Sequence, residues 1–195
     1  GMSEPAEPPS PHVGAVVLAA GQGTRMRSRL PKVLHPLAGV PLIAHVLTAV
    51  RAAGTGELVI VVGHGAPQVQ QALGAQVRYA LQPEQRGTAH AVLQALPLFS
   101  STVARLLVVY GDTPLLTSAT LRALLQAPAP LALLTAVVPD PHGYGRVVRD
   151  DAGRVRAVVE ERDATPEERA QHEINVGAYA FDLEWLRARL PTLTP

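Results

Sequence analysis

The apolar positions of the chain fall into two alternating kinds of segment. Short, mainly apolar runs, which are typical of buried strands, occur at residues 16–18, 58–62, 77–81, 106–110 and 131–138. Segments with apolar residues at helical spacing lie between them, at residues 41–53, 68–73, 88–98 and 118–125. Strands that alternate with helices in this way predict an α/β fold with a doubly wound, mostly parallel sheet of the Rossmann-like kind.

The pattern changes in the last third of the chain. Residues 146–149 and 155–159 flank a turn-rich Asp-Asp-Ala-Gly stretch, and a further extended element is expected at residues 176–181. Two short runs joined by such a turn are typical of an antiparallel hairpin. We therefore expect a small antiparallel substrate lobe in addition to the parallel core.

Particular residues mark where the helices and the folded domain should begin and end. Pro41 suits the first position of a helix, and Gly54 suits the position just after its end. Ser118 is expected to cap a later helix. The proline- and glutamate-rich start of the chain predicts a disordered tail over residues 1–12, followed by one domain over residues 13–195.

Composition and charge exclude some classes of binding partner for this protein. The chain has 195 residues, of which 47% are hydrophobic, no cysteine, and a net charge of +1. Because no block of like charge is present, a nucleic acid partner is not expected. The apolar runs are far shorter than the ~20 residues that span a bilayer, so no membrane association is expected either. These features fit a cytoplasmic protein.

A glycine-rich loop follows the first predicted strand, within the segment from Leu18 to Lys32. Gly21 and Gly23 allow backbone N–H groups to converge on a phosphate. A Rossmann dinucleotide fingerprint needs a third glycine where Met26 stands, and a P-loop needs Gly-Lys followed by Ser or Thr, which is absent. The loop therefore predicts phosphate binding of another kind than that of NAD enzymes or P-loop NTPases.

Two cations lie on the same loop. Arg25 and Lys32 are able to neutralise several oxygens of a triphosphate while charge moves to a leaving pyrophosphate. The alternative is a solvated basic loop between a strand and a helix. The combination of free backbone amides and fixed cations favours the functional interpretation.

A carboxylate follows the predicted strand at residues 106–110. Asp112 lies at the edge of the sheet where open α/β folds bind their ligands. A lone carboxylate is enough for Mg²⁺, which takes most of its other ligands from phosphates and water. The alternative is a turn-forming aspartate before Thr113 and Pro114.

An amide and a helix start follow the predicted strand at residues 77–81. Gln82 is able to pair with the donor or acceptor edge of a pyrimidine. Gly87 and Thr88 come at the start of a predicted helix, where anions are favoured. The alternative is a polar loop with a threonine cap.

The sequence resembles a known enzyme family through a set of motifs in a fixed order. The motifs are LAAGQGTRM with a following PK, QPEQRGTAHA, YGDTPLL, GYGRVVR, VVEERDAT and EINVGAY. Over residues 13–181 they are similar to the uridylyltransferase domain of the bacterial bifunctional N-acetylglucosamine-1-phosphate uridylyltransferase and glucosamine-1-phosphate acetyltransferase. The resemblance implies Mg²⁺-dependent transfer of a uridylyl group from UTP to N-acetylglucosamine 1-phosphate. The products would be pyrophosphate and UDP-N-acetylglucosamine, a precursor of peptidoglycan and lipopolysaccharide.

The resemblance also implies roles for individual residues. Arg25 and Lys32 would act on the phosphates as catalytic residues, and Asp112 would hold Mg²⁺. The sugar contacts would be Tyr110, Gly145, Glu160 and Asn175. The nucleotide contacts would be Leu18, Ala19, Ala20, Gly21, Gly23, Thr24, Gln82, Gly87 and Thr88, with Gln85 and Arg86 as further candidates. By residue type alone, the three sugar candidates of the late lobe are a loop glycine, a surface glutamate and a turn asparagine.

Other polar groups are expected to be structural or solvated. The histidines have no metal-site spacing, and no metal role is assigned to His35, His45, His64 and His90. The glutamate pairs at 160–161 and 167–168 are expected in a solvated loop and a helix start rather than as paired catalytic acids.

Members of the resembling family continue beyond the point that matches Pro195. They carry a motif with an asparagine metal ligand and then an acetyltransferase domain of hexapeptide repeats, which organises a homotrimer. The resemblance therefore implies a monomeric fragment without acetyl transfer, for which nucleotide binding without turnover is one possible outcome. The alternatives are a nucleotidyltransferase for another sugar or base, and a non-catalytic module that binds nucleotide sugars.

Overall fold

The computed structural model describes residues 5–20, 30–63, 65–84, 86–113 and 116–193, with side chains up to residue 189. The chain divides into two units, each described by itself. Unit 1 comprises residues 1–132 and 179–195, and unit 2 comprises residues 133–178. Two strands, β7 (Leu131–Val137) and β10 (Glu173–Asp182), have residues in both units.

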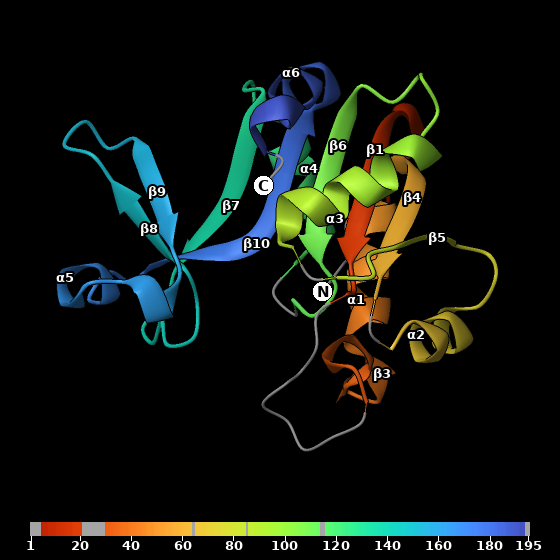
Figure 1. Cartoon of the computed structure of the whole chain (residues 1–195), viewed down its shortest axis with the longest axis horizontal. Coiled ribbons are helices and arrows are strands. Elements are labelled where there is room, and N and C mark those ends of the chain that lie inside the picture. Colours follow the sequence, from red (N-terminus) through yellow and green to blue (C-terminus); the bar gives the residue numbers. More distant parts are fainter. Residues whose placement is uncertain (1–4, 21–29, 64, 85, 114–115, 194–195) are drawn as a thin grey trace. The chain divides into compact units, whose positions relative to one another are not determined.

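Unit 1 is built around parallel strands. They are β1 (Ser10–Leu18), β4 (Thr55–Val62), β5 (Arg78–Leu81) and β6 (Arg105–Tyr110). β1 pairs with β4 on one side and with β6 on the other, and β5 pairs with β4 (Figure 1). Residue Leu18 lies opposite both Val61 and Tyr110, so the carboxyl ends of the strands meet at one edge. This arrangement confirms the predicted α/β fold class with a mostly parallel sheet.

Helices connect the strands of unit 1. The helices are α1 (Leu42–Ala52), α2 (Ala66–Leu73), α3 (Thr88–Ala95), α4 (Ser118–Gln126) and α6 (Leu183–Leu193). The 3-10 segments are η1 (Lys32–Leu34) and η2 (Leu96–Leu98). In Figure 1, α3 lies in front of the strands and α4 behind them. Among the described residues, no helix has the length and apolar character needed to cross a lipid bilayer.

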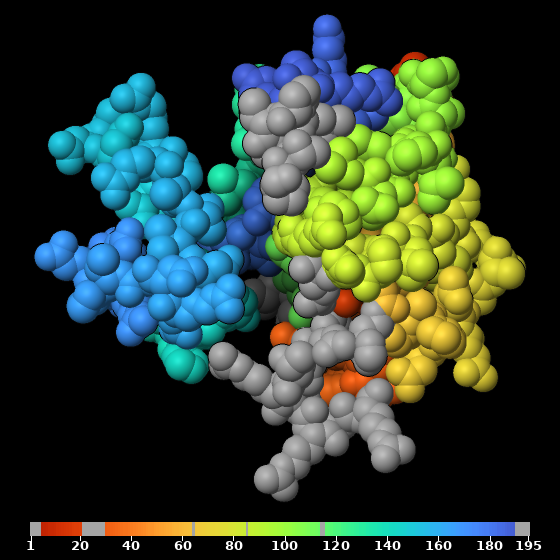
Figure 2. All heavy atoms as spheres, viewed as in Figure 1, coloured from red at the N-terminus to blue at the C-terminus, as the bar shows by residue number. Residues whose placement is uncertain are grey.

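The core of unit 1 is apolar on both sides of the sheet. Val16, Val59 and Val108 have 0% exposure and belong to one cluster with Ala91 and Ala95 of α3. Burial of one valine side chain stabilises the fold by about 1.5–3 kcal/mol. Atoms of α3, in yellow-green, form much of the visible face of unit 1 (Figure 2). The central strands are thus held by their backbone ladders and by apolar side-chain packing.

Unit 2 is built around an antiparallel hairpin. β8 (Arg146–Arg149) pairs with β9 (Val155–Val159), and β8 also pairs antiparallel with β10, where Ile174 lies opposite Arg146. The hairpin is followed by η3 (Glu161–Asp163) and the short helix α5 (Pro166–Arg169). The antiparallel pairing predicted for the late part of the chain is confirmed.

The N-terminus differs from the sequence prediction. The predicted tail over residues 1–12 is wrong for its last residues, because β1 begins at Ser10. The N–H of Ser10 donates to the carbonyl of Gly54 at 2.9 Å, and the N–H of Glu7 donates to that of Ala52 at 3.0 Å. The end of α1 therefore holds this segment through backbone hydrogen bonds, which composition does not reveal.

Two helix starts also differ from the prediction. Thr117, not Ser118, caps α4: its hydroxyl accepts from the N–H of Thr120, and the Thr120 hydroxyl accepts from the N–H of Thr117. Pro41 precedes the first residue of α1, Leu42, and pairs in a short ladder of β2 (Pro36–Leu37) and β3 (Val40–Pro41). Such reciprocal caps depend on side-chain geometry that a residue preference does not specify.

Candidate functional site

A cavity of about 380 Å³ opens at the carboxyl ends of the parallel strands of unit 1. We call it the strand-end pocket. Its volume is in the range of about 300–1,000 Å³ that is usual for small-molecule sites. The described residues that line it are Leu18, Ala20, Lys32, Val33, Gln82, Gly87, Thr88, Ala91, Tyr110 and Asp112. Separate loops after β1, β5 and β6 therefore meet at one cavity, as expected for an open α/β sheet.

Glycines allow the strand ends to approach one another beside this pocket. A Cβ atom at Gly63, which follows β4, would lie 2.8 Å from the backbone oxygen of Gln82 and 3.2 Å from Cβ of Ala20. Real Cβ atoms essentially never come that close to backbone, so a larger residue would push these loops apart. The close contact keeps the loops after β1 and β5 together.

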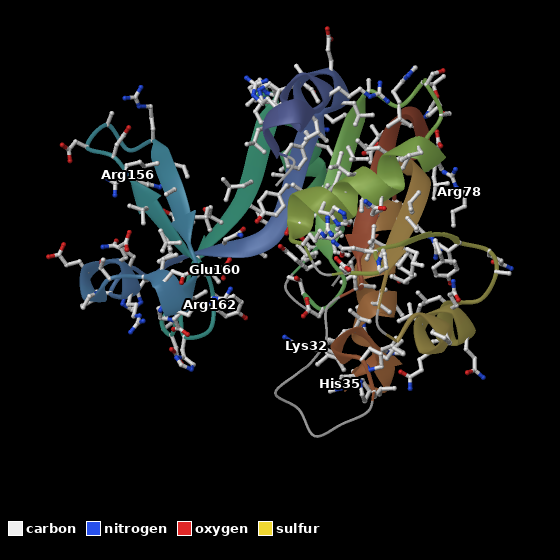
Figure 3. All side chains as sticks on the ribbon, viewed as in Figure 1. Lys32, His35, Arg78, Arg156, Glu160 and Arg162 are labelled. Atoms are coloured by element: carbon white, nitrogen blue, oxygen red, sulfur yellow. The ribbon has the colours of Figure 1, made fainter. Side chains whose placement is uncertain are left out.

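Lys32 and Asp112 form an ion pair in the strand-end pocket. Lys32 begins η1 and is labelled in Figure 3, and Asp112 comes two residues after the end of β6. Nζ of Lys32 lies 3.2 Å from Oδ2 of Asp112, and the two side chains are 54% and 31% exposed. A pair this exposed contributes only about 0–1 kcal/mol to stability. Breaking this ion pair therefore costs little free energy, and each charge is able to bind a charged group of a ligand instead.

Gln82 is a buried polar residue at the end of β5, with only 4% exposure. Its Nε2 donates to the carbonyl of Gly87 at 3.3 Å and lies 3.0 Å from Nδ1 of His90. Its backbone N–H donates to the carbonyl of Val62 at 2.7 Å. The amide is therefore held at both its backbone and its side chain while it lines the pocket.

Gly87 and Thr88 form the start of α3. Gly87 is the N-cap with a φ of 95°, a left-handed conformation that disfavours any residue with a Cβ. No side-chain cap is present, so the alternative of a threonine cap is wrong. The Thr88 hydroxyl instead lies 2.6 Å from the hydroxyl of Tyr110. Thr88 and Tyr110 thus form one hydroxyl pair in the wall of the pocket.

The three sugar candidates of the late lobe lie together in unit 2. The N–H of Asn175 donates to the carbonyl of Gly145 at 2.9 Å, and Oε1 of Glu160 would lie 3.5 Å from a Cβ atom at Gly145. Glu160 follows β9 directly and is exposed (Figure 3). We call Gly145, Glu160 and Asn175 the hairpin cluster. It combines a carboxylate, an amide and a bare stretch of backbone.

A buried cation next to the hairpin cluster was missed by the sequence analysis. Arg146 is 3% exposed and donates to Oε1 of Glu161 at 3.2 Å, to the carbonyl of Arg169 at 3.2 Å, and to the carbonyl of Tyr144. In the sequence it is marked only by its place at the start of an expected strand. Arg146 ties the turn before β8 to the segment after β9.

Glu161 is the acidic partner of this network. Its Oε2 accepts from the N–H of Gly143 at 2.9 Å, and this hydrogen bond, with the nearby Arg146, lowers the pKa of the Glu161 carboxyl. The expectation that the pair at 160–161 is simply solvated is therefore wrong for Glu161. Glu167 and Glu168 do lie at a helix start, where Glu168 completes a capping box with Thr165.

Some candidate residues lie outside the described part of the chain. They are Gly21, Gly23, Thr24, Arg25, His64 and Gln85. Arg86 is described, and its guanidinium pairs with Glu84 at 2.9 Å on the surface rather than lining the pocket. Within the described ranges, no group of three or more histidine and carboxylate side chains is placed to hold a metal ion.

Two of the histidines make local backbone contacts. Nε2 of His35 lies 3.0 Å from the carbonyl of Leu30, and Nε2 of His45 lies 2.7 Å from that of Leu37. Both carbonyls precede α1, and His45 itself lies within α1. His90 differs from them, because it contacts a residue that lines the strand-end pocket.

Known proteins similar in sequence to this chain include members of one enzyme group. Two proteins named bifunctional protein GlmU are similar to this chain. The one from Heliobacterium modesticaldum is 52% identical over 185 residues, and the one from Limosilactobacillus fermentum is 51% identical over 184 residues. These alignments cover 93% and 92% of this chain and 40% of each relative. The chain thus spans about 40% of the length of the curated relatives that it matches.

The fold is also similar to solved structures. The crystal structure of HddC from Yersinia pseudotuberculosis, complexed with GMP-PN, has a TM-score of 0.69 at 21% identity, over 89% of this chain and 78% of that chain. At this identity the likeness concerns the fold. Residues 15–173 match the family described as the MobA-like NTP transferase domain. On this evidence, the chain belongs to the family of MobA-like NTP transferase domains.

Proposed function

We propose that the protein transfers a uridylyl group from UTP to N-acetylglucosamine 1-phosphate. The observation that carries this proposal is the strand-end pocket, where a cation and a carboxylate share one cavity with a buried amide and a helix start. The motifs that resemble the uridylyltransferase family support the same assignment. So does the identity of 52% to a protein named GlmU, although the chain spans only 40% of that relative.

The phosphate end of the proposed site contains Lys32 and Asp112. The ammonium of Lys32 would bind phosphate oxygens as a compact point charge. Asp112 fits a role as a Mg²⁺ ligand, because it is a partly exposed carboxylate that lines the pocket, and Mg²⁺ needs only one or two protein carboxylates beside phosphates. When bound, the ion would neutralise charge on the phosphates. Arg25, with the loop at residues 21–24, would complete this end of the site.

The base end of the proposed site contains Gln82, Gly87 and Thr88. The side chain of Gln82 would contact the uracil ring, and the backbone of Gly87 allows the base to approach α3 closely. The backbone of residues 18–20, at the end of β1, would contact the nucleoside. Each assignment uses a residue that lines the pocket or lies directly beside it.

The sugar contacts are proposed to come from the hairpin cluster and from Tyr110. A carboxylate and an amide are able to hydrogen-bond sugar hydroxyls and an N-acetyl group. Gly145 is buried, and a Cβ atom there would lie 3.3 Å from Cγ1 of Val158 and 3.5 Å from Oε1 of Glu160, so the position has little room for a side chain. Composition alone would not select these residues, so the resemblance and their contacts within unit 2 support this assignment together.

The proposed reaction is one displacement at phosphorus. A phosphate oxygen of the sugar phosphate attacks the α-phosphorus of UTP and forms a new P–O bond. The bond from the α-phosphorus to the bridging oxygen breaks, and pyrophosphate leaves with the electron pair. Such a transfer depends on positioning and charge neutralisation more than on protein nucleophiles. Since UTP and the sugar phosphate are cytoplasmic metabolites, we place the reaction in the cytoplasm.

The test is pyrophosphate release measured for UTP, CTP, dTTP and GTP, each with several sugar 1-phosphates. We expect the highest kcat/KM with UTP and N-acetylglucosamine 1-phosphate. A higher kcat/KM with another base or sugar would assign the protein to a different nucleotidyltransferase activity. Binding of UTP without pyrophosphate release in every combination would indicate a nucleotide-binding module.

A further inference from the structure

The strand-end pocket contains an amide whose orientation is determined by its neighbours. The carbonyl of Gly87 accepts hydrogen bonds from the N–H of Ala91 at 3.1 Å and from Nε2 of Gln82 at 3.3 Å. A carbonyl oxygen only accepts, so the NH₂ group of Gln82, and not its oxygen, must face Gly87. This contact commits the first of the two amide hydrogens.

His90 takes the second amide hydrogen of Gln82. Nδ1 of His90 lies 3.0 Å from Nε2 of Gln82, while Nε2 of His90 lies 3.3 Å from Nε2 of Gln94. A neutral imidazole has only one acceptor nitrogen, so only one of these amides can donate to it. The amide of Gln82 is fixed by Gly87, whereas that of Gln94 has only a 3.4 Å contact with the carbonyl of His90. Nδ1 is therefore the acceptor, Nε2 carries the proton, and Gln94 turns its oxygen toward it.

The remaining polar atom of Gln82 is its Oε1. No hydrogen bond to this oxygen occurs among the described residues, and in that part of the chain no buried side-chain nitrogen or oxygen lacks a partner. Oε1 therefore keeps some exposure, although Gln82 as a whole is only 4% exposed. Because Gln82 lines the strand-end pocket, this oxygen is the group that it offers to a ligand.

We infer that His90 is a specificity-determining positioning residue, which holds Gln82 so that it presents a hydrogen-bond acceptor to the base. This inference rests on the proposed function, in which Gln82 contacts the base. Uracil carries a donor at N3–H, whereas N3 of cytosine is an acceptor, so the fixed Oε1 would pair with uracil and oppose cytosine. Thymine shares the N3–H donor, and this contact does not separate it from uracil.

The experiment measures dissociation constants for UTP and CTP by isothermal titration calorimetry, with Mg²⁺ and without the sugar phosphate. In the wild type we expect tighter binding of UTP. In His90→Ala the amide of Gln82 is free to reverse, and the preference for UTP over CTP should fall about tenfold, which corresponds to one hydrogen bond gained and one opposed. Thermal melting checks that the variant is folded.

Two matched variants separate positioning from general damage. His90→Asn can place an oxygen acceptor near the position of Nδ1, so it should keep most of the preference for UTP. Gln94→Ala removes the other amide beside the ring and should leave the ratio of the two constants unchanged. An equal loss of preference in His90→Asn and Gln94→Ala would overturn the inference.

A second measurement needs no destabilising change. Long-range ¹⁵N NMR of the imidazole rings, with His90→Asn for assignment, reads which nitrogen of His90 carries the proton. We expect the proton on Nε2, and a proton on Nδ1 would overturn the inference.

The outcomes also separate this inference from the proposed function. Preference of the wild type for UTP together with an unchanged ratio in His90→Ala would overturn the inference alone. Failure of the wild type to bind UTP, or a preference for CTP, would overturn both.

Discussion

The two units position their candidate residues by different physical means. In unit 1, Gln82, Tyr110 and Asp112 lie at or just beyond the ends of parallel strands whose central residues are fully buried. In unit 2, Gly145 and Glu160 flank a hairpin, and side-chain hydrogen bonds of Arg146 join the segments before and after that hairpin. Backbone and core packing thus fix the strand-end pocket, whereas an ion-pair network fixes the hairpin cluster.

This difference is visible in the exposure of the strands. Val59 in β4 has 0% exposure, while Val155 in β9 has 39%. Unit 2 also contains a second ion pair, between Arg149 and Glu173 at 2.7 Å. We therefore expect that substitutions of charged residues in unit 1 change its chemistry but leave its geometry intact. In unit 2, we expect such substitutions to change the geometry itself.

The largest effect is expected at Asp112. Asp112→Ala removes the proposed Mg²⁺ ligand and leaves Lys32 without its partner, so kcat/KM should fall by at least about 1,000-fold. The free energy of unfolding should change by less than about 1 kcal/mol, because the ion pair is exposed. Pyrophosphate release and urea unfolding measure the two quantities.

Asp112→Asn is the matched control for that prediction. It keeps the shape of the side chain but removes its charge, so most of the activity should be lost here as well. Near-normal turnover in either variant with Mg²⁺ would contradict the metal assignment. A large loss of stability would instead contradict the claim that the backbone and core packing hold this part of unit 1.

The next effect is expected at Arg146. Arg146→Ala leaves the Glu161 carboxylate without its buried partner and frees the turn that carries Gly145. We expect a loss of about 2 kcal/mol in the free energy of unfolding, because the carbonyls of Tyr144 and Arg169 lose a charged donor, and an increase of about tenfold in the KM for the sugar phosphate. The KM for UTP should not change. Equal increases in both KM values would contradict a separate role for unit 2.

A control of similar chemistry exists in unit 1. The guanidinium of Arg105 donates to the carbonyls of Leu125 at 2.9 Å and Ala129 at 2.8 Å, and to Asp182 at 2.9 Å. Arg105→Ala should cost about 2 kcal/mol in urea unfolding, since several carbonyls lose a charged donor. Both KM values should stay as in the wild type, because Arg105 does not line the strand-end pocket. A selective rise in one KM would show that stability and site geometry are coupled in unit 1 too.

The smallest effect concerns acid pH. The pKa of Glu161 is lowered in the folded state, mainly by the N–H of Gly143, so its stabilising contribution is complete above the ordinary carboxyl pKa near 4.5 and is lost as the pH falls further. The difference in unfolding free energy between wild type and Glu161→Gln should therefore shrink below pH 4.5. Urea unfolding between pH 7 and pH 3 measures it.

Glu57→Gln is the matched substitution in unit 1. Hydrogen bonds from Ser100 and Arg78 lower the pKa of Glu57, so the same trend with pH is expected. Only Glu161→Gln should also raise the KM for the sugar phosphate at neutral pH. A rise in that KM with Glu57→Gln would remove the contrast between the two units.

Much of the parallel core could be predicted from the sequence, for a physical reason. Buried parallel strands are apolar on both faces, so runs such as residues 58–62 and 106–110 are visible without any partner strand. The position of Asp112 at a strand end followed directly from such a run. The cap at Thr117 and the strand start at Ser10 did not, because each depends on hydrogen bonds that form only in the folded chain.

The contacts that organise the candidate sites were harder to predict. Gln82 was selected from the sequence, but its contact with His90 across the first turn of α3 depends on side-chain conformation. Likewise, Arg146 and Glu161 lie at opposite ends of the hairpin in the sequence. They come into contact only because of the register in which β8 pairs with β9. The sequence analysis selected the groups that are proposed to touch a ligand, and the structure adds the groups that hold them.

Hydrogen–deuterium exchange with bound ligands is the most direct test of the claim that unit 1 binds the nucleotide and unit 2 the sugar. UTP with Mg²⁺ should slow exchange in peptides that contain Gln82 and Thr88, and should leave peptides with Gly145 and Asn175 unchanged. UDP-N-acetylglucosamine should slow exchange in both sets. Slower exchange with UTP only in the peptides of unit 2, or in neither set at saturating UTP, would contradict the account.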